Sequence, residues 1–173
     1  MNFPPLEDAI FSPLTGASHN RRISAWTNYG YASPGVEQIA ETGMNKILAE
    51  ALTGVPLIKE VIAADGPAPY DGSHSVMATL DPKFTQLSFL TMIFPSPDWF
   101  TGIENKNMCT KRGTWKNKSV GLLYPWDAGT DSGKTYLAED VDTQPRENIA
   151  ILKEAPLFGK PLGYYIIRRV GAY

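Results

Sequence analysis

The sequence has few of the residues on which several common classes of protein depend. It contains a single cysteine, Cys109, which excludes an intramolecular disulfide and a cysteine-rich zinc site. No apolar run approaches the ~18 residues that a membrane-spanning helix needs, so we expect no transmembrane segment. The 16 basic and 18 acidic residues nearly cancel to a net charge of −2, which is not the positive excess of a nucleic-acid-binding protein.

Groups that could carry out catalysis are also scarce. The chain has only two histidines, His19 and His74, and no Gly-x-Ser-x-Gly segment that would position a nucleophilic serine. Residues 129–135 (GTDSGKT) resemble a phosphate-binding loop, but the spacing between the glycines is too short and no helical pattern follows. We therefore expect that the protein is not an enzyme.

The composition favours a single folded domain with many turns. The 173 residues are enough to bury a core, and 43% of them are hydrophobic while 20% are charged. The 15 glycines and 14 prolines exceed the usual combined share of about 12%. An excess of turn residues is typical of domains built from short strands.

One helix and several strands are predicted from the pattern of apolar residues. Ser33 and Pro34 suit the start of a helix, which we expect over about residues 33–52. Residues 86–94 are apolar on both alternating faces, as in a strand that is buried on both sides.

We expect irregular structure over residues 1–30 and a surface loop over residues 63–74. The other predicted strands are 75–80, 118–124, 134–138, 147–153 and 163–170. Together they predict a mostly β, single-domain antiparallel β-sandwich with a peripheral helix.

Two turn-rich loops combine carboxylates with aromatic residues. Asp98 lies in residues 95–102 (PSPDWFTG), and Asp127 and Asp131 lie in residues 124–133 (YPWDAGTDSG). If both loops lie at one end of a sandwich, the three carboxylates repel one another unless a cation or raised pKa values relieve them. Ca²⁺ suits such loops because it takes six to eight oxygen ligands. The alternative is that turns simply favour aspartate and glycine.

Three blocks of the sequence resemble, in order, the spondin domain, the module found in F-spondin and mindin. They are residues 12–20 (SPLTGASHN), 95–100 (PSPDWF) and 123–133 (LYPWDAGTDSG), and residues 31–36 (YASPGV) fit as well. On this resemblance we expect an N-terminal extension at 1–10 and a spondin-like domain at 11–173. The resemblance implies an antiparallel sandwich similar to calcium-dependent lipid-binding domains. It also implies a site for Ca²⁺, in preference to Mg²⁺, with Asp98, Asp127 and Asp131 as ligands.

The resemblance further implies extracellular adhesion or recognition. The expected partner is a glycan, a matrix component or a cell-surface protein, with no role for nucleic acid. The first residues lack the basic and apolar regions of a signal peptide, so we expect the mature form of a secreted protein. The alternative function is an oligomeric structural or carrier protein that binds an apolar small molecule between protomers.

Three further features stay open at this point. The aromatic side chains of Trp99, Phe100 and Trp126 either form a ligand-contacting rim around the cation or plug the end of the core. Relatives usually carry additional cysteines, so Cys109 is either an unpaired remnant or the link of a homo-oligomer. Asn117 begins an Asn-Lys-Ser glycosylation sequon, a short pattern that also arises by chance.

Overall fold

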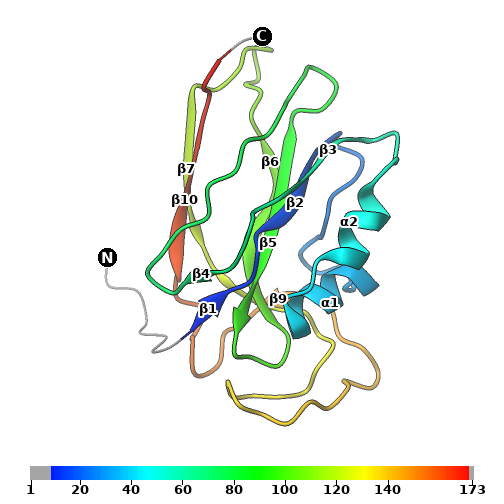
Figure 1. Ribbon diagram of the computed structural model, residues 1–173, viewed down its shortest axis with the longest axis vertical. Helices are drawn as coiled ribbons and strands as arrows, with labels where there is room; N and C mark the ends of the chain where they lie inside the picture. Colours follow the sequence, from blue (N-terminus) through cyan, green and yellow to red (C-terminus); the bar gives the residue numbers. More distant parts are fainter. Residues whose placement is uncertain (1–8, 172–173) are drawn as a thin grey trace.

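A computed structural model describes residues 9–171, which form two sheets with a pair of helices on one side (Figure 1). The larger sheet has eight strands in a central path β3-β2-β5-β6-β8-β9, with β1 beside β5 and β4 beside β1. A two-stranded ribbon, β7-β10, forms the second sheet. In chain order the elements are β1 (Ile10–Phe11), β2 (Thr15–His19), α1 (Pro34–Thr42), α2 (Lys46–Leu52), β3 (Ile58–Ala63), β4 (Ala68–Pro69), β5 (Gln86–Phe94), β6 (Trp99–Asn107), β7 (Lys118–Leu123), β8 (Pro125–Asp127), β9 (Ala150–Ile151) and β10 (Gly163–Arg168).

All the strand pairs are antiparallel, which confirms the predicted mostly β, antiparallel sandwich with peripheral helical structure. Strand β5 lies at the centre of the larger sheet, between β2 and β6. Its Leu90 packs in the cluster beneath the helices, whereas Leu87 and Phe89 pack in a cluster with Ile167 of the ribbon. The apolar pattern of residues 86–94 therefore reflects a strand buried on both faces, as predicted.

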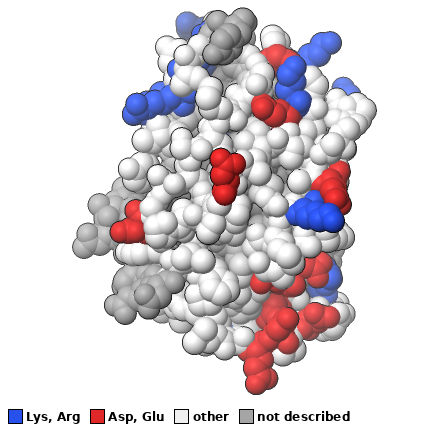
Figure 2. Space-filling model, in the orientation of Figure 1, with Lys and Arg blue, Asp and Glu red and all other residues white. Residues whose placement is uncertain are grey.

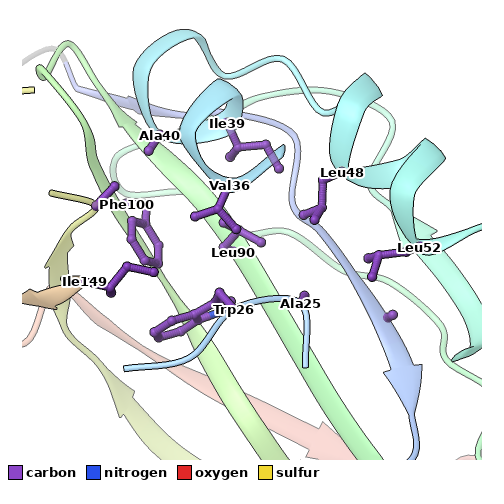
Figure 3. Close-up of a cluster of buried hydrophobic side chains, with 12 residues drawn as sticks. Ala25, Trp26, Val36, Ile39, Ala40, Leu48, Leu52, Leu90, Phe100 and Ile149 are labelled. Atoms are coloured by element: carbon purple, nitrogen blue, oxygen red, sulfur yellow. The ribbon is translucent and has the colours of Figure 1, made fainter. Parts of the chain in front are cut away.

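The predicted helix over 33–52 is two helices in the structure. Ser33 caps α1 by accepting the backbone N–H of Val36 at 3.3 Å. Gly43 ends α1 because its left-handed φ of +71° turns the chain, and its N–H closes onto Ile39. The remaining part of the apolar pattern then forms α2, and both helices cover the sheet through a shared core (Figure 3).

Several strand predictions are corrected by the structure. Residues 75–80 and 134–138 contain no strand, and within 147–153 only Ala150–Ile151 is one. The segment 75–80 forms no strand pairing, but its Val76, Ala78 and Leu80 pack in the Ile167 cluster. Conversely, β2 lies in the region expected to be irregular, and β3 and β6 were not predicted.

Residues 9 and 10, at the start of the described part of the chain, contact the sheet. Ala9 is buried and Ile10 pairs with Phe94 of β5. The other residues of the expected extension lie outside the described part of the chain. Among residues 9–171, no helix has the length and apolarity that crossing a membrane requires.

Candidate functional site

The two aspartate-bearing loops meet at one end of the larger sheet. Strand β6 begins at Trp99, whose register partner on β8 is Asp127. The backbone N–H of Ala128 donates to the carbonyl of Asp98 at 3.2 Å, so the first loop and the second are joined directly. This pairing brings residues that are far apart in sequence to the end of the molecule drawn lowest in Figure 1.

Asp98 is the buried centre of this arrangement. Its side chain is 0% exposed. One carboxylate oxygen, Oδ2, accepts the backbone N–H groups of Thr130 at 2.8 Å and Asp131 at 3.1 Å, and the Thr130 hydroxyl at 3.3 Å. The other oxygen, Oδ1, is buried and has no hydrogen-bond partner among the described residues. Burial raises the pKa of Asp98, and the charge of Asp131 adds to the shift.

Asp127 lies in a more open position and accepts the N–H of Gly129 at 2.8 Å. Burial, and then the neighbouring charge of Asp98, raise its pKa to about 7. Gly129 has a left-handed φ of +73°, and a Cβ there would lie 2.4 Å from the carbonyl oxygen of Glu147. The tight turn between Asp127 and Asp131 therefore requires glycine at this position.

Asp131 organises the loop that follows it. Its Oδ1 accepts the N–H of Gly133 at 2.6 Å, and its Oδ2 accepts the N–H of Val141 at 2.7 Å. The second bond joins residues ten positions apart in the chain, and Asp131 and Asp142 also form an isolated β-bridge. Each carboxylate oxygen has a second lone pair, so these bonds leave Asp131 able to accept further contacts.

Sequence reasoning missed Glu41, which approaches this end from the last turn of α1. Burial raises its pKa, the polar side chain of Thr130 opposes the shift, and the charges of Glu37 and Asp98 add to it. Glu37 is itself bound by Arg146, whose guanidinium contacts both carboxylate oxygens. The i, i+4 spacing of the two glutamates placed them on one helical face, but nothing in the sequence connected that face with residues 98 and 130.

The residues fit a hard cation in two respects. Their donors are all oxygens, and the buried Oδ1 of Asp98 is an acceptor without a donor. Burying a carboxylate oxygen unpaired is costly, and a nearby cation would offset that cost. Within residues 9–171, however, no three histidine, cysteine, aspartate or glutamate side chains lie together as they would around a bound metal ion. Both oxygens of Asp131 are turned towards backbone N–H groups.

Of the two alternatives for the three aromatic residues, burial in the core describes Trp99 and Phe100. Trp99 and Phe100 are both 0% exposed, and only Trp126 reaches the surface in part. Trp26 makes edge contacts with Phe100 and Trp126 at centroid distances of 5.0 and 5.2 Å. Trp99 packs against Tyr136 on the opposite face of the sheet. These aromatic residues hold the end of the core, and only Trp126 is available to a ligand.

The remaining residues singled out from the sequence lie away from the acidic loops. His19 is buried, and its Nε2 lies 2.8 Å from the hydroxyl of Ser88 within the sheet. Cys109 has a free, partly buried thiol, and its backbone forms an isolated β-bridge with Trp115. Asn117 is exposed just before β7. Two shallow depressions of about 370 and 450 Å³ are lined mainly by β3 and its neighbours and include none of the three aspartates.

Comparison with known protein sequences finds relatives of this chain. The Spondin_N family model matches residues 1–160. Spondin-1 from Gallus gallus is 39% identical over 146 residues, which cover 80% of this chain and 18% of that protein. Spondin-2 from Rattus norvegicus is 34% identical and Spondin-2 from Homo sapiens is 31% identical, each over 145 residues that cover 82% of this chain and 44% of the relative. The chain therefore spans less than half the length of these relatives.

Proposed function

This chain belongs to the Spondin_N family, and on that premise we propose that it is an extracellular adhesion or recognition domain whose loops at one end are fixed by Ca²⁺. Membership of a family that contains Spondin-1 and Spondin-2 supports the matrix-related or adhesive role. The role is binding and not turnover. The partner we propose is a glycan, a matrix component or a cell-surface protein.

The observation that carries the proposal is the unpaired, buried Oδ1 of Asp98. A carboxylate that is fully buried next to Asp127 and Asp131 has a high free energy unless it is protonated or paired with a cation. Burial is the main cause of the raised pKa values of Asp98 and Asp127, and the neighbouring aspartate charges raise them further. Asp98, Asp127 and Asp131 are the proposed ligands, and a bound Ca²⁺ would supply the positive charge that stabilises all three carboxylates.

The function of the chain's own residues is to connect and orient two loops. Asp98 fixes Thr130 and Asp131 through their backbone N–H groups, and Asp131 fixes Val141. The segment from 127 to 142 is therefore tied to the turn that precedes β6. Loops held in this way present a fixed surface, which includes the accessible part of Trp126, to an acidic or hydroxyl-rich group of the partner.

Calorimetric titration of Ca²⁺ into chelator-stripped protein tests the proposal. Asp98→Asn keeps the shape and an acceptor for the Thr130 and Asp131 N–H groups but removes the charge, so we expect the Ca²⁺ affinity to fall at least about tenfold. The matched control is Glu139→Gln, which removes an exposed charge from the same loop and should leave the affinity within about twofold. Equal affinities for the wild type and Asp98→Asn would overturn the proposed site.

A further inference from the structure

The charges of the chain are unevenly distributed along the molecule, although they nearly cancel in sum. Residues 105–126 contain five lysines and arginines and no acidic residue, and residues 155–173 contain three more, again with no acidic residue. In Figure 2, the largest group of acidic side chains on the visible face lies at the end of the acidic loops, and basic side chains predominate, with a few acidic ones among them, towards the other end. The basic end is therefore a separate feature from the proposed Ca²⁺ site.

Strand pairing assembles the basic end from three segments. Lys118, the first residue of β7, lies opposite Arg168, the last residue of β10. Arg169 follows, with its backbone N–H bonded to the carbonyl of Asn117 at 3.0 Å. Residues 109 and 115 form a bridge that closes the hairpin between β6 and β7. The basic end consists of Lys111, Arg112, Lys116, Lys118, Arg168 and Arg169, which are exposed apart from the partly buried Lys116.

The pairing of Lys118 with Arg168 is unfavourable for the isolated protein. Directly opposed residues of an antiparallel pair have Cβ atoms about 4.5–5.5 Å apart, and like charges there are destabilising. None of the six residues forms a salt bridge with another described residue. Two cations held face to face without an anion between them form a charge array that a bound polyanion would stabilise.

We infer that the basic end binds a linear sulfated polysaccharide. The cations lie on an exposed ribbon and hairpin, which suits an extended chain of sulfate groups more than a small anion that needs an enclosing pocket. Tyr164, 60% exposed, lies on the same face of β10 as Arg168, because side chains two and four residues apart share a face. Its ring offers an apolar surface to a sugar between the charged groups.

An anionic membrane is the less favoured partner on structural grounds. A loop that inserts into a bilayer carries apolar residues at its tip. The tip of this hairpin, residues 110–114, reads Thr-Lys-Arg-Gly-Thr and has none. The inference does not rest on the proposed Ca²⁺ site, because the basic end and the acidic loops lie at different ends of the fold.

The test measures binding of heparin to the protein at about 0.15 M salt, where exposed charges are screened beyond ~8 Å. The protein is produced without N-glycans because Asn117 lies beside Lys118. Lys118→Thr with Arg168→Thr should weaken binding about tenfold. The same variant should unfold at an equal or higher temperature, since the like-charge pair is gone and a Thr–Thr pair is favourable across strands. Lys134→Thr with Lys153→Thr removes the same charge from two exposed positions elsewhere and should leave the affinity within about twofold.

Two further binding measurements distinguish a sulfated polysaccharide from other polysaccharides and from an anionic membrane. Unsulfated hyaluronan should bind at least about tenfold more weakly than heparin if the sulfates are recognised. Equal losses of heparin affinity in both double variants, or equal affinity for the two polysaccharides, would overturn the inference. Binding to vesicles containing phosphatidylserine in the absence of heparin binding would overturn it in favour of a membrane. Heparin binding should persist in chelator and in Asp98→Asn, so a failed Ca²⁺ site leaves this result intact.

Discussion

The Oδ2 of Asp98 accepts the backbone N–H of Asp131 at 3.1 Å, a contact between residues 33 positions apart in the chain. One proposed ligand thereby positions another. The three aspartates are therefore not equivalent: Asp98 is the buried support, Asp131 closes the following loop, and Asp127 is the more open of the three. Substitutions at the three positions should consequently have different effects on stability and on cation binding.

Two substitutions of Asp98 distinguish the effect of its charge on stability from the effect of its hydrogen bonds. In chelator, Asp98→Asn should be at least as stable as the wild type, because it removes buried like-charge repulsion and keeps an acceptor. Asp98→Ala leaves the Thr130 and Asp131 N–H groups without that acceptor, which costs about 1–3 kcal/mol for each group. Chemical unfolding in chelator compares the two variants. Equal losses in both would show that the negative charge itself stabilises the metal-free fold.

Glu41 should strengthen cation binding from outside the predicted loops. The charges of Glu41 and Asp98 repel each other, and the Thr130 hydroxyl donates to Asp98. Glu41→Gln should therefore lower Ca²⁺ affinity roughly fivefold while leaving the metal-free protein as stable or slightly more stable. Calorimetric titration measures the first effect. The control is Glu50→Gln on α2, where the exposed carboxylate pairs only with Lys46, at 3.9 Å, and should not affect the affinity.

Gly129 should be far less tolerant of substitution than another glycine of similar backbone conformation. Gly129 and Gly54 have φ values of +73° and +76°, but a Cβ meets the Glu147 backbone only at Gly129, and nothing lies within 4 Å at Gly54. Gly54→Ala should cost about 1 kcal/mol of stability from backbone strain alone, and Gly129→Ala more than about 2 kcal/mol. Denaturant unfolding of the two variants provides the comparison, and similar costs would argue against a fixed turn at Gly129.

His19 should make the fold less stable in acid. Burial lowers its pKa from 6.5, so between the lowered pKa and 6.5 the unfolded chain binds more protons than the folded one. The contribution of neutral His19 to the free energy of unfolding is therefore complete above about pH 6.5. It is lost as the pH falls, by up to about 1.4 kcal/mol per pH unit.

Unfolding of two variants at different pH values tests this prediction for His19. The pKa of His74 is also lowered by burial, so the experiment starts from His74→Gln and compares it with the variant that adds His19→Gln. The free energy of unfolding of the first protein should fall more steeply from pH 6.5 to 5 than that of the second. Parallel curves would mean that His19 keeps its ordinary pKa in the fold.

The predictability of each element depended on whether its burial was visible in its own residues. Strand β5 was predicted correctly because both faces of residues 86–94 are apolar. Strand β2 was missed because its five residues, Thr-Gly-Ala-Ser-His, are small or polar even though all five are buried. The sequence predicts one helix over 33–52 because Gly43 lies inside a continuous apolar pattern. Only the left-handed conformation of Gly43 separates α1 from α2.

The candidate site was predictable in part for a similar reason. Asp98, Asp127 and Asp131 lie in loops whose turn residues and aromatic neighbours are visible in the sequence. Their different hydrogen bonds depend on the pairing of β6 with β8 and could not be derived from spacing. Glu41 comes from a helix 57 residues before Asp98, so only the packing of α1 on the sheet reveals it. The basic end could not be predicted from the net charge of −2, because a net charge does not show where in the fold the charges lie.

The melting temperature of chelator-stripped protein, followed through a Ca²⁺ titration with Mg²⁺ as the control, tests the central claim most directly. A ligand that binds only the folded state adds about 2.7 kcal/mol at 100 times its Kd, which corresponds to roughly 5–10 °C for a domain of this size. We predict a saturating rise that is selective for Ca²⁺ and that requires at least about tenfold more Ca²⁺ in Asp98→Asn. A flat curve, or an equal rise in the wild type and Asp98→Asn, would contradict a calcium site at the buried carboxylate.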